Sequence, residues 1–377
     1  MLTKPLCFRS AKLTAALGLL AALAALPALG QHYNVTDLIA DQTSTAPSAT
    51  NPPDSNLVNS WGMSRASASP WWISDNGTGK TSFYNGTGAS VLINNPDDFV
   101  TIPVRKGQTA PTNPTGTVFN YTGGFQVGPN APAIFIFVTE DGTISGWNPG
   151  VDRKNAILKA DPKGAIFKGC SIAMWSGAPF LYVTDFGTAS VDVFDANFKP
   201  VPLPSWAFRD SRIPSSYSPF NIQNVGGNLV VTFAKQETKG AVDEEHGPGL
   251  GFISIFDPAG HLLQRLEHNN LLNAPWGIAL APSDFGVFSH RLLIGNFGDG
   301  TIHAFNLLTG KLEGTLLDAA TGNPLTVDGL WGLNFGGGTA ASGAANELFF
   351  TAGPNDESDG LLGKITAVGS EQRGNTE

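Results

Sequence analysis

The sequence predicts an all-β fold, a six-bladed β-propeller, and three observations lead to this prediction. Short apolar runs bounded by Gly, Pro, Asn or Asp recur along the chain, and each run is too short for a helix. The runs come in groups of three joined by turns, and six such groups follow one another. Charged residues make up only 14% of the chain whereas aromatic residues reach 10%, which is typical of a body with little polar helix surface.

The clearest group is residues 271–306, where two apolar runs flank the sequence NFGDG. A Gly-rich turn of this kind joins antiparallel strands, so one group is predicted to be a three-stranded meander. The other five groups open near residues 59, 114, 170, 218 and 328. Units that recur every roughly 45 to 60 residues indicate radial repetition, in which each blade covers its neighbours.

The last group indicates how the ring closes. A fourth, more polar run follows the third in earlier groups, as in NAILKAD, LLQRLEH and KLEGTLLD, but the chain ends soon after residue 368. Residues 33–40 form a strand that belongs to no group. We therefore expect this N-terminal strand of the mature chain to pair with the last blade and close the ring.

The first thirty residues have the pattern of a signal peptide. Lys4, Arg9 and Lys12 precede an apolar stretch at residues 13–26, and small residues at 28–30 form a cleavage site. The stretch is shorter than the roughly 20 residues that span a bilayer. The predicted organisation is a signal peptide at 1–30, a propeller at 31–369 and a disordered tail at 370–377. We expect a secreted or periplasmic protein with no membrane span in the mature chain.

The charge of the mature chain argues against nucleic acid as a partner. Three of the 22 basic residues and none of the 31 acidic residues lie in the signal peptide, which leaves 19 against 31, a net charge of −12. A body this acidic repels phosphate backbones and anionic lipid surfaces.

Aromatic residues recur at the start of the innermost strand. Trp61, Trp276 and Trp331 are each followed by glycine, which would let inner strands crowd the axis while the ring covers the end of the core. The functional alternative is an aromatic ring at the channel mouth that stacks on a sugar or a planar ligand. Both interpretations of these tryptophans stay open.

Polar residues recur at the end of the second strand, namely Asp75, Glu140, Asp185 and Asn296, with Phe233 and Ala352 in the matching places of the other two units. A carboxylate or amide there can accept backbone N–H groups of the following turn. Alternatively, symmetry would bring the four oxygen-bearing side chains towards one face, where they could present hard ligands to Ca²⁺.

Two acidic insertions break the repeat, residues 235–250 in the fourth unit and 353–360 in the sixth. Both connect a second strand to a third, so both are expected on the same side of the ring as lids over one end of the channel. His246 and Glu357 are the candidate general bases. Lys235, Asn355 and Asp356 are the loop side chains expected to contact a ligand. A merely solvated acidic loop is the alternative.

Several long strings resemble a known group of proteins, namely TEDGTISGWNP, SPFNIQNVGGNLVVTFAKQ, LNAPWGIALAPSDFG and ELFFTAGPNDE. They are similar to those of an uncharacterised family of secreted bacterial propellers, loosely related to NHL-type propellers. The resemblance covers residues 33–368 and implies the fold and export, but it implies no reaction and no site residues.

Two hypotheses on function follow. The first is a secreted binding or scaffolding module for a small molecule, a carbohydrate, a peptide or an envelope protein. The second is a calcium-dependent hydrolase of esters or lactones, by analogy with six-bladed enzymes that hold a metal at the channel mouth. No GxSxG, HExxH, CxxC or Walker-type motif is present in the sequence.

Overall fold

The computed structural model describes residues 1, 32–93, 98–109 and 111–369. Apart from Met1, the predicted signal peptide at 1–30 lies outside the described residues, and so does the predicted tail at 370–377. Within the described part the only helical segment is the short 3-10 helix η1 (Gly286–Phe288). No helix there is long and apolar enough to cross a membrane.

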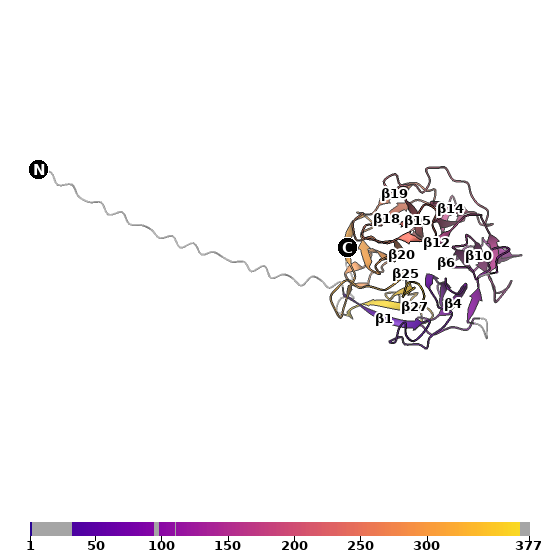
Figure 1. Ribbon diagram of the computed structural model, residues 1–377, viewed down its shortest axis with the longest axis horizontal. Helices are drawn as coiled ribbons and strands as arrows, with labels where there is room; N and C mark the ends of the chain where they lie inside the picture. Colours follow the sequence, from indigo (N-terminus) through magenta and orange to yellow (C-terminus); the bar gives the residue numbers. More distant parts are fainter. Residues whose placement is uncertain (2–31, 94–97, 110, 370–377) are drawn as a thin grey trace.

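Six β-sheets surround a central axis, which confirms the predicted six-bladed propeller (Figure 1). Blade one contains β2 (Ser60–Ser64), β3 (Trp71–Asp75), β4 (Lys80–Tyr84) and β5 (Phe99–Thr101). Blade two contains β6 (Pro114–Phe119), β9 (Phe135–Thr139), β10 (Ile144–Trp147) and β11 (Ile157–Ala160). A hairpin of β7 (Gln126–Gly128) and β8 (Ala131–Pro132) interrupts blade two.

Blades three to five continue the same antiparallel order. Blade three contains β12 (Phe167–Trp175), β13 (Ala178–Asp185) and β14 (Ser190–Phe194). Blade four contains β15 (Tyr217–Val225), β16 (Asn228–Gln236), β17 (Glu244–Glu245), β18 (Gly251–Phe256) and β19 (Leu262–Arg265). Blade five contains β20 (Pro275–Leu280), β21 (Leu292–Asn296), β22 (Ile302–Phe305) and β23 (Leu312–Thr315).

Blade six is completed by the N-terminal strand, as predicted from the sequence. It contains β25 (Leu330–Phe335), β26 (Leu348–Ala352) and β27 (Leu361–Ala367), and β1 (His32–Ala40) pairs antiparallel with β27. On its other side β1 meets the two-residue strand β24 (Leu317–Asp318). The hydroxyl of Tyr33 also donates to the carbonyl of Phe285, 3.0 Å away, and so links the closing strand to blade five.

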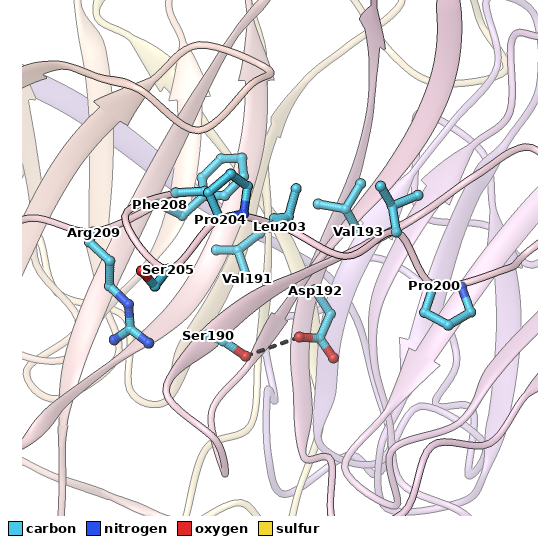
Figure 2. Close-up of a pocket in the computed structure, with 12 residues that line it drawn as sticks. Ser190, Val191, Asp192, Val193, Pro200, Leu203, Pro204, Ser205, Phe208 and Arg209 are labelled. Atoms are coloured by element: carbon cyan, nitrogen blue, oxygen red, sulfur yellow. Dashed lines mark hydrogen bonds between the residues drawn. The ribbon is translucent and has the colours of Figure 1, made fainter.

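Blade three differs from the others because its sheet has three strands rather than four or five. In place of a fourth strand, residues 200–209 run beside β14. The N–H group of Val201 donates to the carbonyl of Val193, and prolines in the segment, which have no N–H group, limit further pairing with β14. Between the segment and β14 lies a cavity of about 320 Å³. Figure 2 shows that Ser190 and Asp192, which share a hydrogen bond of 3.0 Å, lie apart from the apolar side chains of the cavity.

The innermost strand of every blade carries a register shift at its first residues, where it pairs with the second strand. Such a bulge turns a side chain away from the regular alternation of a strand. The six residues at this bulge position are Trp61, Thr115, Lys168, Phe220, Trp276 and Trp331.

Glycine follows five of these six residues because neighbouring inner strands touch there through their backbones. A Cβ atom added to Gly62 would lie 2.4 Å from the carbonyl oxygen of Thr115, and one added to Gly116 would lie 2.7 Å from the backbone nitrogen of Cys170. This contact supports the structural interpretation of the Trp-Gly pairs.

Candidate functional site

Aromatic side chains from the bulge position and from the turns after two second strands cluster at one end of the ring. The aromatic floor, as we call this cluster, is buried and consists of Trp61, Phe186, Phe220, Trp276, Phe297 and Trp331. Trp331 stacks between Trp61 and Phe297, with ring centroids 3.5 and 3.8 Å away. Trp276 meets both other tryptophans edge-on. Because the rings cover one another, the floor itself is rigid and largely dry.

Lys168 occupies the bulge position of blade three and brings a charge to this floor. Its side chain is 1% exposed, and its Nζ lies 4.8 Å from the ring centroid of Trp61. The same Nζ donates to Oε1 of Glu140 at 2.5 Å. Burial lowers the pKa of Lys168, but the charges of Glu140 and Glu244 outweigh burial, so its pKa is raised. Lys168 is therefore a permanent cation in the site.

Glu140 follows β9 in blade two and links two blades to Lys168. Its second carboxylate oxygen accepts a hydrogen bond from Nδ2 of Asn76 at 3.0 Å, and Asn76 belongs to the matching turn of blade one. The carboxylate is thus oriented from both sides, by an ammonium and by an amide.

Glu357 reaches the site from the insertion in blade six. Asn355, Asp356 and Glu357 all have positive φ angles, 55°, 51° and 63°, which is a strained backbone for residues other than glycine. Burial raises the pKa of Glu357 to about 7, and the charges of Glu244 and Glu140 add to this effect, although a hydrogen bond from Asn59 opposes it. Glu357 therefore titrates near neutral pH.

Asn59 connects Glu357 to the aromatic floor. Its Nδ2 donates to Oε2 of Glu357 at 2.6 Å, and its Oδ1 accepts from the indole N–H groups of Trp61 and Trp331 at 3.1 and 3.2 Å. Asn59 is 4% exposed, so these contacts are made away from solvent. The amide fixes the carboxylate relative to both indoles.

The insertion in blade four supplies Glu244 and His246. The strand β17 pairs with the end of β16, and this pairing places Glu244, whose side chain is 5% exposed, against Lys168. The ring of His246 is 5.0 Å from Phe297 of the floor, and its Nε2 is 3.3 Å from Oε1 of Glu244. The hydrogen bond to Glu244 raises the pKa of His246, and the charge of Glu357 raises it further against the effect of burial.

These residues form what we call the mouth site, which consists of Glu140, Lys168, Glu244, His246 and Glu357 above the aromatic floor. Three carboxyl groups from three blades face one ammonium group and one imidazole. A site of this kind can bind a cationic group, since its acidic groups outnumber its permanent cation, and it can exchange a proton near neutral pH through Glu357 and His246.

The two predicted bases, His246 and Glu357, both belong to this site, and the charge of Glu357 acts on His246. The other predicted loop residues have different surroundings. Lys235 pairs with Glu245 at 2.5 Å, Asn355 donates to Asp359, and Asp356 is exposed. Trp61, Trp276 and Trp331 are at most 4% exposed, so they underlie the site rather than face solvent.

The four residues predicted to bind calcium lie on the same side of the ring but have different surroundings. Asp75 is fully buried and its Oδ1 accepts from Ser82 Oγ at 3.2 Å. Asp185 accepts backbone N–H groups of Ile166 and Thr188, as expected for a turn cap. Within the described residues no group of three or more His, Cys, Asp or Glu side chains is placed to hold a metal ion.

The amide of Asn296 likewise serves its own turn, where its Nδ2 donates to Asp299 and Thr301. Glu140 is held by Lys168, as described above. In blade four Phe233 pairs with Pro219 just before the bulge, as Asn296 pairs with Pro275 in blade five, so it occupies the predicted matching place although β16 continues to Gln236. In blade two the matching place is Thr139, which pairs with Pro114, so Glu140 lies one residue beyond it.

Sequence reasoning missed Lys168, Glu244 and Asn59. The signal for Lys168 was present, because Lys168-Gly169 stands where Trp61-Gly62 and Trp331-Gly332 stand in other units. A charged residue at a position that is otherwise aromatic or Thr marks the site. Asn59 and Glu244 carried no such signal, because their roles depend on contacts across the ring.

Comparison with known proteins places the chain in a family. No family model matches it. Uncharacterized protein L690 of Acanthamoeba polyphaga mimivirus is 32% identical over 326 residues, which cover 83% of this chain and 81% of the viral protein. Uncharacterized protein R648 of the same virus is 31% identical over 344 residues, which cover 88% and 80%. The chain belongs to the family of these two proteins.

Solved structures agree on the fold. The structure of a streptogramin B lyase has a TM-score of 0.51 and 12% identity, covering 89% of this chain and 97% of that one. A protein of unknown function from Bacteroides thetaiotaomicron VPI-5482 has a TM-score of 0.52 and 10% identity, covering 89% and 76%. At this identity the likeness concerns the fold alone. The family relatives are viral, so they lend no support to the bacterial and exported character expected from the resemblance.

Proposed function

We propose that the protein is a ligand-binding propeller and that the mouth site holds the ligand. The observation that carries this proposal is the convergence of both insertions. They are the two acidic insertions in the repeat, and they supply His246 and Glu357 to one place above the aromatic floor. A scaffold without a ligand would have no need to gather buried carboxyl groups, which repel one another.

The charges of the mouth site favour a ligand with an ammonium or guanidinium group. Lys168 is bonded to Glu140 and also interacts with the charges of Glu244 and Glu357, so one permanent cation serves three carboxyl groups, and the imidazole of His246 is the other basic group of the site. A cation that enters would stabilise the ionised form of Glu357 and lie close to the rings of the floor. A basic peptide or an amino sugar of the cell envelope fits this chemistry.

Calorimetry with a permanent cation tests this proposal. Choline should bind at pH 8, while its uncharged isostere dimethylbutanol should not, and choline affinity should fall as the pH drops below about 7 and Glu357 becomes protonated. The variant E357Q should weaken choline binding at least about fivefold, whereas E245Q, which removes a carboxylate from the insertion of blade four, should not. Equal binding of choline and its isostere, or of neither, contradicts the proposal.

A second candidate function is acid–base hydrolysis of an ester or lactone. It is favoured by the pKa of Glu357, about 7, beside His246, because a general base works best when its pKa lies near the working pH. Turnover of a lactone panel that E357Q and H246Q both abolish would support an enzyme. Metal analysis of the purified protein tests the calcium-dependent version, for which a stoichiometric Ca²⁺ that resists dialysis is the expected result.

We also propose that the chain is exported, on the signal-peptide pattern of residues 1–30. Expression with a C-terminal tag, followed by mass spectrometry of the protein from the medium or the periplasm, should give a chain that begins at Gln31. Recovery of the full-length chain in the cytoplasm alone would refute export.

A further inference from the structure

A second candidate site lies along the outer edge of blade four and shares no residue with the mouth site. Two cavities of about 480 and 420 Å³ adjoin there and have three lining residues in common, Asp210, Ile213 and Arg265. Volumes of this size hold small molecules. Their walls come from β19 and from the connection between blades three and four, and we call the combined space the basic groove.

The charge of the basic groove is opposite to that of the protein. Four basic side chains line it against two carboxylates, namely Arg209, Arg212, Arg265 and Lys311 against Asp210 and Glu267. The chain as a whole has 22 basic residues and 31 acidic ones. A local excess of positive charge on an acidic body attracts anions to that place alone.

Arg265 is oriented in the way that suits an anion. Its Nε lies 2.6 Å from Oδ1 of Asp210, whose side chain is 1% exposed and also accepts from Ser254 Oγ at 2.8 Å. Within the described part of the chain this is the guanidinium's one hydrogen bond, so both terminal nitrogens stay available. A guanidinium that is fixed through Nε can present its fork to an oxyanion with little loss of entropy.

Arg209 and Arg212 add mobile charge beside this fixed group. Both side chains are exposed, and neither takes part in an ion pair with any residue that the structure describes. Figure 2 shows Arg209 at one end of the adjacent cavity beside β14. The groove thus has two arginines that form no ion pair with a described residue, beside a third that a buried carboxylate holds in place. An anionic ligand could pair with all three guanidinium groups.

The groove also has an apolar wall. Phe252 lines it together with Ile213, and the ring of His268 stacks on Phe252 with centroids 4.1 Å apart and an angle of 9° between the planes. A flat apolar group could pack against this wall while a charged group reaches Arg265.

We propose that the basic groove binds a small phosphate monoester with an aromatic or other flat apolar body. The phosphate would contact Arg265 and Arg212, and the apolar body would pack against Phe252 and Ile213. Phosphate is favoured over a singly charged carboxylate because two unpaired positive charges match a group that carries about −1.5 to −2 at neutral pH.

Calorimetry with phenyl phosphate at low ionic strength tests this inference. Phenyl phosphate should bind saturably and more weakly as salt is added. Inorganic phosphate should bind several-fold more weakly, and benzyl alcohol, which carries a similar ring without a charge, should not bind. R212Q should weaken phenyl phosphate binding about tenfold, because a lost charged hydrogen bond removes about one decade of affinity. R209Q/R212Q should weaken it further, because the charge of Arg209 also attracts the anion into the groove.

The matched control is R153Q, which removes an exposed arginine from blade two and should leave binding unchanged. Arg212 is exposed, so its replacement should not unfold the protein, and an unchanged melting temperature would show this. The proposal is overturned if wild-type protein shows no saturable binding of phenyl phosphate, if R209Q/R212Q binds it like R153Q, or if benzyl alcohol binds as tightly. E357Q should bind phenyl phosphate normally, which separates this inference from the proposed function of the mouth site.

Discussion

Asn59 shows how much of the mouth site depends on one side chain. An amide has two donors and one acceptor oxygen, and those of Asn59 reach Glu357, Asn76 and the indoles of Trp61 and Trp331. Its φ of 47° is also unusual for a residue other than glycine. Strain of this kind persists where surrounding contacts determine the conformation, and here those contacts are the ones that position Glu357.

Glu357 should make the stability of the protein depend on pH. Because its pKa is raised to about 7, the folded chain holds this proton more tightly than the unfolded chain. The resulting stabilisation is complete below the ordinary carboxyl range and is lost as the pH rises through about 7. We expect E357Q to be more stable than wild type at pH 8 by about 1–2 kcal/mol, after a discount for partial exposure, and to lose the advantage at pH 5.

Urea unfolding at both pH values measures this difference. A constant gap between E357Q and wild type would show that the carboxyl does not titrate in this range. E245Q is again the matched control, because Glu245 is far more exposed and forms a surface ion pair with Lys235.

Asp75 and Asp185 occupy matching positions, but replacement by asparagine should raise the stability of the protein at Asp75 and lower it at Asp185. Burial raises the pKa of Asp75 well above its usual value, and its Oδ2 is buried without a partner among the described residues. D75N should therefore raise stability at pH 8 by about 1–3 kcal/mol. D185N should lower it by about 1–2 kcal/mol, because the Asp185 carboxylate accepts three hydrogen bonds within its turn region.

Unfolding in urea at pH 8 compares the two variants. If D75N instead proves as destabilising as D185N, Asp75 is ionised and held by a cation, which would favour the calcium hypothesis. The measurement is repeated after metal has been removed with a chelator, which shows whether a bound cation accounts for the loss of stability in D75N.

At the scale of secondary structure, the strand β1 closes the ring. It adds the buried side chains of Tyr33, Leu38 and Ile39 to blade six, and it joins the start of the propeller to β27 near its end. Deletion of residues 32–40 should cost at least about 5 kcal/mol, since two or three large apolar side chains lose their burial and the edge of β27 is exposed.

Deletion of residues 370–377 is the control for this experiment and should leave the melting temperature unchanged. Comparable melting of the two truncated proteins would mean that the ring holds without its closing strand. Because removal of β1 can reduce the folded yield, the milder change L38A, expected to cost about 2–4 kcal/mol, provides a second measurement.

At the scale of the whole molecule, stability depends on how closely six inner strands approach the axis. G116A places a Cβ 2.7 Å from the backbone nitrogen of Cys170 in the next blade, and backbone cannot move aside as a flexible side chain can. We expect a loss of about 1–3 kcal/mol. G123A is the matched control, because nothing lies within 4 Å of its added Cβ.

Thermal unfolding of both glycine variants tests this expectation. A G116A protein that melts like G123A would show that the ring can widen at its axis without cost. In that case the aromatic floor would be a looser assembly than the stacked rings of Trp61 and Trp331 indicate.

The sequence determined the blade number, the closing strand and the end of the ring to which the insertions belong, because each depends on local periodicity. Short apolar runs can only be strands, a repeated meander can only bury its faces against copies of itself, and a strand left over at one terminus fills the place left at the other. The same periodicity predicted that His246 and Glu357 lie at one end of the ring, because the connections between equivalent strands lie on one side of a propeller.

The tertiary structure alone decided which side chains meet. Lys168 lies on blade three, Glu140 on blade two and Glu244 on blade four, and no spacing along the chain reveals that they share one charge cluster. The repeat suggested that Asp75, Glu140, Asp185 and Asn296 form a symmetric set of metal ligands. In the structure each of these side chains has a hydrogen-bond partner of its own, such as Thr188 for Asp185. Periodicity fixes where a backbone position falls, whereas the partner of a polar side chain is fixed by distances across the ring, which only the folded chain determines.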